Sequence, residues 1–353
     1  MGPHAADSHG QPIKPARSQG DTIIRHPRIR ARRRAALAAL LTLSALIATG
    51  CGDSDSGATS GKAKGLEKST ITVGQMPIID DAQLQLAIDR GLFKAEGLTV
   101  RTRMIQTGAD AIPALKGGSL DISYGAYPSW FQAQEKKVID LKVVSDAYSM
   151  RPGALTVSVP KGSDIKSAKD LAGKKIAVNA RHNMVTLLLH AGLKPHGVKL
   201  DEEKNTVEMP FPQMEAALKN GSVDAAIFAE PFPTQTAKNI GAKVVLDCGK
   251  GPTADMPIGS YAATSGFAAE NPKTVAAFQR AIAKAQKLLA DPAVRKEIIP
   301  KYTKIPPALV PELKFGDYPA TPDVAKLEKV TRIMRDIGYL KKPLDIEPLL
   351  VKS

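Results

Sequence analysis

The sequence predicts an α/β protein with two lobes, each built on a mostly parallel sheet flanked by helices, and a ligand cleft between the lobes. Three observations lead to this prediction. A fifteen-residue segment occurs twice in the chain, each copy joins a helix to a short apolar strand, and another strand precedes each copy.

The repeated segment is the most informative feature. Residues 114–128 align without gaps to residues 217–231, and eight of the fifteen positions are identical. In both copies a helix is expected to end at a glycine (Gly117 or Gly118, then Gly221), and a proline follows the apolar strand. Each copy is therefore read as one helix–strand unit.

The residues before each copy complete the unit. A strand is expected at 98–105 in the first half and at 205–209 in the second, so each half contains strand, helix and strand in that order. Such a unit makes a parallel sheet through a right-handed crossover, and ligands bind beyond the carboxyl ends of its strands. Two such sheets that face each other would form a cleft.

Three further helices are expected from their start signals and apolar stripes. One begins after Asp81 and ends at Gly91, one begins at Asn271 before a proline, and one begins at Thr321 before a proline and stops at Gly338. These stripes are interpreted as core.

The first fifty residues read as a processing segment. A basic stretch runs into an apolar stretch, 35–48, whose 14 residues are fewer than the roughly 20 that a spanning helix needs. Small residues then precede Cys51, which resembles a bacterial lipoprotein signal and implies a lipid on Cys51. Residues 51–68 are expected to form a flexible tether, and both the general secretory and the twin-arginine export routes remain open.

Composition excludes several classes of protein. Without residues 1–50 the 49 basic and 35 acidic residues become 41 and 33, a weakly basic balance that suits an anionic solute. Scattered lysines and few aromatics give no support for nucleic-acid binding. The only other cysteine is Cys248, and the spacings of His182, His190 and His196 do not give a zinc site. We expect no metal and no cofactor.

Several segments resemble one family of binding proteins. Residues 71–80, 86–100 and 170–178, together with the two repeats and the helix at Asn271, are similar to the nitrate, taurine, aliphatic-sulfonate and thiamine-precursor group of ABC transporter substrate-binding proteins. The resemblance implies a type II periplasmic-binding-protein fold in which the chain crosses between lobes near 154–160 and 247–259. Lobe 1 would then comprise residues 69–155 and 258–345, lobe 2 residues 156–257, and 346–353 a C-terminal tail.

The resemblance also implies the function. The chain would be a monomeric, exported lipoprotein on the outer face of the bacterial cytoplasmic membrane, and not an enzyme. It would capture a small anionic or zwitterionic organic solute and deliver it to an ABC permease and its ATPase subunit. Two alternatives remain open: a receptor for a heteroaromatic solute like a thiamine precursor, and a cell-surface sensor or scaffold of the same fold.

Candidate solute contacts in the first lobe follow the expected strands. Asp80 either binds the solute or begins a helix, and Trp130 either forms an apolar wall or packs in the core. Free backbone N–H groups at the start of the helix after residue 106 favour an acidic group. The candidates are Gln75, Met76, Asp80, Thr107, Gly108, Tyr124, Gly125, Tyr127 and Trp130.

The second lobe supplies the remaining candidates. Arg181 is expected to grip an oxyanion with two parallel hydrogen bonds, beside a helix N-terminus. Glu230 either accepts a hydrogen bond from an ammonium group of the solute or locks a loop. The candidates are Asn179, Arg181, Asn183, Glu230 and Phe232.

Overall fold

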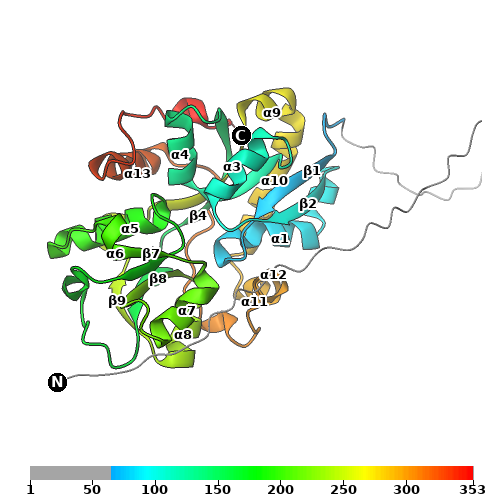
Figure 1. Ribbon diagram of the computed structural model, residues 1–353. Coiled ribbons are helices and arrows are strands. Elements are labelled where there is room, and N and C mark those ends of the chain that lie inside the picture. The colour runs from blue at the N-terminus through cyan, green and yellow to red at the C-terminus, as the bar shows by residue number, and fades with distance from the viewer. Residues whose placement is uncertain (1–64, 353) are drawn as a thin grey trace, which may run out of the picture. The chain divides into compact units, whose positions relative to one another are not determined.

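The computed structural model describes residues 65–352, and its strands form two five-stranded sheets (Figure 1). The first sheet has the order β2-β1-β3-β10-β4 and the second β7-β6-β8-β5-β9. One strand in each sheet, β10 or β5, is antiparallel to its two neighbours. The strands are β1 Thr70–Gln75, β2 Thr99–Met104, β3 Ile122–Ala126, β4 Leu141–Ser149, β5 Leu155–Val159, β6 Ile176–Val178, β7 Thr206–Glu208, β8 Ala225–Ala229, β9 Lys243–Asp247 and β10 Pro257–Thr264. The expected α/β class with two mixed, mostly parallel sheets is confirmed.

Helices lie against both sheets, and the longest, α10, packs on β4 and on helices α1 and α2. Its apolar stripe, which includes Val275, Phe278 and Ile282, is fully buried. Among the described residues, no helix combines the length and the apolar character needed to cross a bilayer. The helices are α1 Ala82–Asp89, α2 Leu92–Ala95, α3 Gly108–Lys116, α4 Tyr127–Glu135, α5 Met184–Leu193, α6 Glu202–Asn205, α7 Phe211–Lys219, α8 Phe232–Ile240, α9 Ser265–Glu270, α10 Pro272–Leu288, α11 Pro292–Ile298, α12 Pro300–Thr303 and α13 Val324–Asp336.

The sequence repeat corresponds to a structural repeat. Helix α3 and strand β3 occupy the same repeat positions as α7 and β8, and each helix is followed by a glycine with positive φ, Gly118 at 70° and Gly221 at 74°. The parallel trios β2-β1-β3 and β7-β6-β8 are equivalent. The repeat therefore places the carboxyl ends of equivalent strands at equivalent positions in the two sheets.

The chain passes between the sheets twice. It leaves the first sheet at Ser149 and enters the second at Leu155, slightly before the expected range of 154–160, and it returns between Asp247 and Pro257. We call residues 65–149 and 257–352 the first lobe and residues 155–247 the second. Arg151, between the lobes, forms two ion pairs of 2.7 Å: the one with Asp255 ties the two crossing segments together, and the one with Asp317 ties the first crossing to the first lobe.

Two of the expected helix starts differ in detail. Asp81 stands at the N-cap position of α1, but its carboxylate accepts hydrogen bonds from the Met76 N–H at 3.0 Å and from the Tyr261 hydroxyl instead of capping the helix. Helix α13 begins at Val324, later than the Thr321 start, because the carboxylate of Asp323 accepts the Lys326 N–H and supplies the cap.

Candidate functional site

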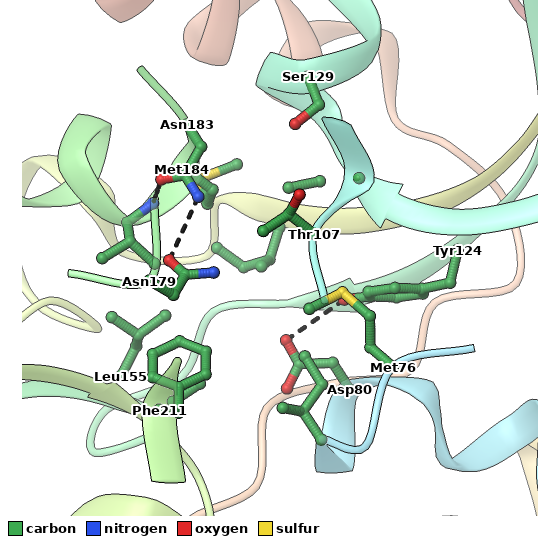
Figure 2. Close-up of a pocket in the computed structure, with 16 residues that line it drawn as sticks. Met76, Asp80, Thr107, Tyr124, Ser129, Leu155, Asn179, Asn183, Met184 and Phe211 are labelled. Carbon is green, nitrogen blue, oxygen red and sulfur yellow. Dashed lines mark hydrogen bonds between the residues drawn. The ribbon is translucent and has the colours of Figure 1, made fainter. Parts of the chain in front are cut away.

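A pocket lies between the two lobes (Figure 2). Both lobes supply its walls. The first lobe contributes Met76, Ile78, Asp80, Thr107, Gly108, Tyr124, Ala126, Ser129 and Ile258, and the second contributes Leu155, Asn179, Asn183, Met184, Val185, Phe211 and Ala229.

Asp80 provides the carboxylate of the pocket. Among the described residues that line the pocket it is the only acidic one, and none is a lysine, arginine or histidine. Asp80 is 4% exposed, and the hydroxyl of Tyr124 donates a hydrogen bond to its Oδ2 at 3.4 Å. Burial raises the pKa of Asp80 to about 7, which the hydrogen bond from Tyr124 offsets only in part. Asp80 therefore changes charge near neutral pH.

Two asparagines form the polar part of the second lobe's wall. The Oδ1 of Asn183 caps α5 by accepting the N–H groups of Val185 at 2.9 Å and Thr186 at 3.4 Å. The Nδ2 of Asn183 then donates to the Oδ1 of Asn179 at 3.2 Å. Since an amide has one oxygen and one nitrogen, this chain of bonds leaves the Nδ2 of Asn179 to face the pocket (Figure 2).

Four helices begin at the pocket. Thr107, Ala126 and Asn183 are the N-caps of α3, α4 and α5, and Phe211 is the first residue of α7; all four residues line the pocket. Helix N-termini carry partial positive charge and free N–H groups, so they favour an acidic or carbonyl group of a ligand. The side-chain caps of α3 and α5 already use some of these N–H groups.

Apart from Ser129, the rest of the pocket is apolar. Phe211 stacks on Phe232, with ring centroids 5.5 Å apart and an interplanar angle of 21°, so Phe232 supports the pocket wall from behind. Met76 and Met184 add flexible thioethers, and Leu155 adds a branched side chain. A solute with an apolar body and a few polar groups would fit these walls.

Half of the candidate residues from the sequence line this pocket: Met76, Asp80, Thr107, Gly108, Tyr124, Asn179 and Asn183. The structure places the other candidates elsewhere: Gln75, Gly125, Tyr127, Trp130, Arg181, Glu230 and Phe232.

Arg181 is directed into the second lobe. Its guanidinium donates to both the hydroxyl and the carbonyl oxygen of Thr206 at 2.8 Å and lies 3.3 Å from the carboxylate of Glu208. These partners satisfy the guanidinium in its own lobe. Arg181 does not line the pocket of Figure 2, but it lines an adjoining interlobe pocket that shares Thr107, Ser129 and Asn183 with it.

Glu230 and Tyr127, which occupy equivalent repeat positions, both bond to protein partners. Glu230 accepts hydrogen bonds from the Thr234 hydroxyl at 2.6 Å and from the Lys314 N–H at 3.1 Å. Burial raises the pKa of Glu230 to about 7. The hydroxyl of Tyr127 donates to buried Asp146 at 3.1 Å.

Trp130 packs on the backbone of Gly125. A Cβ atom added to Gly125 would lie 2.2 Å from the indole ring, and Trp130 itself is 1% exposed. The indole therefore belongs to the core of the first lobe, behind the pocket. Gln75 is likewise buried, at 2% exposure.

Sequence reasoning missed nine lining residues: Ile78, Ala126, Ser129, Leu155, Met184, Val185, Phe211, Ala229 and Ile258. The repeat contained a signal for some of them. Phe211 is the repeat equivalent of Gly108, and Ala126 is the equivalent of Ala229, so applying the first lobe's positions to the second would have found Phe211. Leu155 and Ile258 lie in the two expected crossing ranges, 154–160 and 247–259, but they were not chosen as solute contacts because those were sought in the loops after strands.

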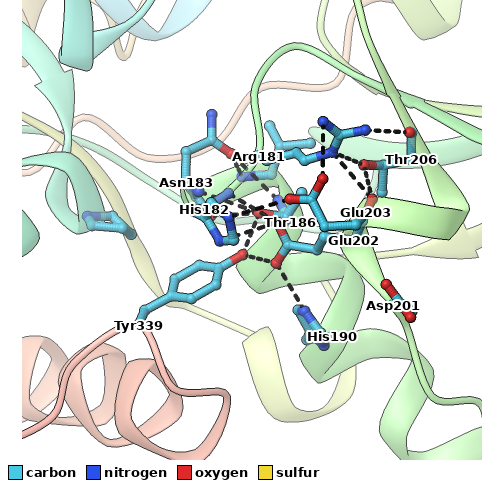
Figure 3. Close-up of polar contacts among 12 residues, drawn as sticks. Arg181, His182, Asn183, Thr186, His190, Asp201, Glu202, Glu203, Thr206 and Tyr339 are labelled. Carbon is cyan, nitrogen blue, oxygen red and sulfur yellow. Dashed lines mark hydrogen bonds and ion pairs between the residues drawn. The ribbon is translucent and has the colours of Figure 1, made fainter.

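The lobes also meet outside the pocket, around Glu202 (Figure 3). Tyr339, which follows α13 of the first lobe, hydrogen-bonds through its hydroxyl to Glu202 and to Thr186 of the second lobe. Glu202 further accepts from the ring of His190 and from the His182 N–H, both at 2.9 Å. Burial acts to raise the pKa of Glu202, but these hydrogen bonds outweigh it and lower the pKa to about 2.

Other interlobe contacts flank the pocket. Gln132 of α4 donates to the carbonyl oxygen of His182 at 2.6 Å, and the Lys314 N–H bonds Glu230. Lys238 of α8 also forms an ion pair with Glu312. The lobes are therefore joined by polar contacts at several points.

No group of three or more histidine, cysteine, aspartate or glutamate side chains in residues 65–352 is arranged to hold a metal ion. Cys248 is unpaired and buried, and burial raises the pKa of its thiol. The lipidation prediction for Cys51 lies outside the described residues.

This fold and pocket define a two-lobed binding protein. A similar architecture is found in the alkanesulfonate-binding protein SsuA of Xanthomonas axonopodis pv. citri, solved with MOPS, with a TM-score of 0.69 and 21% identity over 81% of this chain and 99% of that chain. The periplasmic nitrate-binding protein NrtA of Synechocystis PCC 6803 is also similar, with a TM-score of 0.67 and 17% identity over 80% of this chain and 85% of that chain. In sequence, the chain is 29% identical over 274 residues to a binding protein of Brucella abortus, covering 74% of this chain and 83% of that one. Over 142 residues it is 30% identical to an aliphatic sulfonates-binding protein of Escherichia coli, covering 40% of this chain and 43% of that one.

Residues 64–301 match the NMT1-like family, and the chain belongs to that family. The resemblance inferred from the sequence motifs is therefore confirmed at the level of family and fold. These relatives are named as binding proteins, and, as expected, the chain is a binding protein and not an enzyme.

Proposed function

We propose that this protein is the extracytoplasmic solute-binding component of an ABC importer and that its solute is a small organic molecule bound between the lobes. The observation that carries the proposal is the interlobe pocket, which is lined by both lobes and bordered by the starts of four helices. A site made by two lobes can couple solute binding to lobe closure, which is how a permease would distinguish the loaded protein.

The helix starts support an acidic or carbonyl group on the solute. The sulfonate- and nitrate-binding names of the relatives agree with this. In this proposal the positive helix ends replace the grip by Arg181 that the sequence suggested, since no lysine or arginine is among the described lining residues. Sulfonates, taurine, nitrate and carboxylates are therefore the first solutes to test.

A heteroaromatic solute is the second candidate. Phe211, which stacks on Phe232, lines the pocket with its ring, and an aromatic wall of this kind favours a heteroaromatic solute. A thiamine precursor would use that wall, whereas nitrate would not.

The proposal includes export and a lipid anchor on Cys51, followed by delivery to a permease and its ATPase as a monomer. The cysteine after small residues and a short apolar run supports the anchor. Cys51→Ser should release the protein from membranes in a fractionation experiment; if the variant stayed in the membrane fraction, the anchor would have to be elsewhere.

A thermal-shift screen tests the solute-binding role. The full-length chain, freed of bound solute, is screened against sulfonates, taurine, nitrate, bicarbonate, thiamine precursors and amino acids. A solute at about 100 times its Kd should stabilise the protein by about 2.7 kcal/mol. Asn179→Trp, which would fill the pocket, should abolish the shift, and Asn220→Trp on an exposed turn should preserve it. Absence of any shift from folded protein would favour a sensor or scaffold role.

A further inference from the structure

The first lobe presents a hydrogen-bond acceptor to the pocket. Among the described residues, Tyr124 is the only side chain that donates to the carboxylate of Asp80, through Oδ2 at the long distance of 3.4 Å, and the backbone N–H of Asp80 itself is the other donor. Figure 2 shows this carboxylate at the pocket wall. The neighbouring Asp81 differs, since both of its oxygens are bonded, by Met76 and Tyr261. The carboxylate of Asp80 is thus buried and has few hydrogen-bond donors, so a further donor from a ligand would stabilise it.

The second lobe presents a donor. The bond chain from α5 through Asn183 fixes the oxygen of Asn179 toward Asn183, so that the amide nitrogen of Asn179 is left to donate. The starts of α5 and α7 lie on the same side of the pocket and add partial positive charge. The two walls are therefore of opposite hydrogen-bonding character.

We propose that the solute carries two different polar ends: an amine or ammonium donor that meets Asp80, and an acidic or carbonyl acceptor that meets Asn179 and the helix starts. This inference rests on the proposed function and narrows its solute class to amino-acid-like molecules, including amino-sulfonates. A simple anion would leave the Asp80 carboxylate with the long bond from Tyr124 as its only side-chain partner and would place a second negative charge near it. A cation between the two walls compensates the buried carboxylate instead.

The ionisable groups around Asp80 fix how its charge responds to pH. They are Asp81 on the same turn and the tyrosines that burial keeps neutral by raising their pKa values well above 10: Tyr124 of β3, Tyr148 of β4, Tyr302 of α12 and Tyr318. Asp81 is bonded away from the pocket, and its pKa is raised well above the usual range by burial. Binding of an amine should therefore strengthen as the pH rises from 6 to 8, through the pKa of about 7 of Asp80.

Matched probes test the proposal on the full-length protein by calorimetry at pH 8. Each series contains one compound with both an amine and a sulfonate and two analogues that each lack one of these groups. In the first series taurine is compared with ethanesulfonate and ethylamine. In the second, para-(aminomethyl)benzenesulfonate is compared with toluenesulfonate and benzylamine. In at least one series the two-ended compound should bind at least ~10-fold more tightly than either analogue. Asp80→Asn should remove the advantage over the sulfonate and its pH dependence, while Asp164→Asn, an exposed carboxyl that does not line the pocket, should change neither.

Two results would overturn the inference while leaving the proposed function intact: plain sulfonates that bind as tightly as their amino analogues in every series that binds, or a preserved advantage in Asp80→Asn. Failure of every probe and of the wider solute screen to bind folded protein would instead refute both. Asn179→Asp is a second variant that keeps the side-chain size, and it should weaken binding of the sulfonate end while ethylamine or benzylamine binds as well or better. Equal losses for all probes would contradict the assigned orientation. The melting temperature of each variant checks that it folds.

Discussion

At the scale of single residues, three buried carboxylates near the lobe boundary show how burial and hydrogen bonds compete in setting a pKa. Asp80 receives one long hydrogen bond and Glu230 two, and burial raises both pKa values to about 7. Glu202 receives bonds from His190, Tyr339 and a backbone N–H, and its pKa falls to about 2. Burial is the largest influence on all three pKa values, and only at Glu202 do the hydrogen bonds outweigh it.

Asp80→Asn should stabilise the solute-free protein at alkaline pH. The folded pKa of about 7 lies above the reference value of 3.8, so the wild type loses stability as the pH rises from 4 to 7, and the amide does not. We expect the variant to gain about 1–3 kcal/mol at pH 8 and nothing near pH 4. Urea unfolding at both pH values measures this, and an equal or lower stability at pH 8 would contradict it.

Glu202→Gln should destabilise the protein at neutral pH. The folded pKa of about 2 lies below the reference value of 4.5, so the ionised carboxylate stabilises the fold fully above pH 4.5, and this stabilisation disappears as the pH falls toward 2. A loss of about 1–3 kcal/mol at pH 7 is expected, with a smaller difference at pH 3. Glu203→Gln, whose side chain is 71% exposed, is the control and should have little effect.

At the scale of elements, the repeated segment predicted the positions of helices and strands better than the helix or strand propensity of single segments did. It located α3 with β3 and α7 with β8, because glycine turns and apolar strands recur in the same order. The cap of α13 was misplaced because Thr321 and Asp323 are both good caps, and only the hydrogen bond to Lys326 decides between them. The carboxylate of Asp81 was misassigned for a different reason, since its partner Tyr261 is distant in sequence.

Gly125→Ala should loosen the junction between β3 and α4. The added methyl would lie 2.2 Å from the ring of Trp130, so the indole or the strand must shift, at a cost of about 1–3 kcal/mol. Gly266→Ala in α9 is the matched control. Nothing lies within 4 Å of its added methyl, so this change should be neutral or stabilising by up to ~1 kcal/mol. Thermal melts and tryptophan fluorescence, which reports on the single indole, distinguish the two; an unchanged spectrum and melting point for Gly125→Ala would show that the indole yields without cost.

At the scale of the whole described body, the positions of strand ends could be predicted from the sequence, but the directions of side chains could not. Asn179, Arg181 and Asn183 share one loop, yet two face the pocket and one faces the second lobe. Arg181 turns because Thr206 and Glu208 of the adjacent strand β7 offer acceptors, a choice set by tertiary contacts. The same limit hid the contact between Tyr339 and Glu202, residues that are far apart in the sequence.

Those interlobe contacts give the last prediction. Gln132 and Tyr339 bond the second lobe without lining the pocket, so they should favour the arrangement in which the lobes meet. Removing them with Gln132→Ala and Tyr339→Phe together should weaken solute binding by roughly 10- to 150-fold, since three interlobe hydrogen bonds of about 0.5–1 kcal/mol each are lost, one from Gln132 and two from Tyr339.

The variant should also show a larger radius of gyration in X-ray scattering without solute and should return to the wild-type value at saturation. Lys204→Gln, which breaks an ion pair within the second lobe, is the control and should change neither quantity. Wild-type affinity together with wild-type scattering in the double variant would mean that these bonds do not bias the lobes. In that case lobe closure would depend on the solute, the pocket walls and the other interlobe contacts, which include Lys314 with Glu230, Lys238 with Glu312 and Lys194 with Asp336.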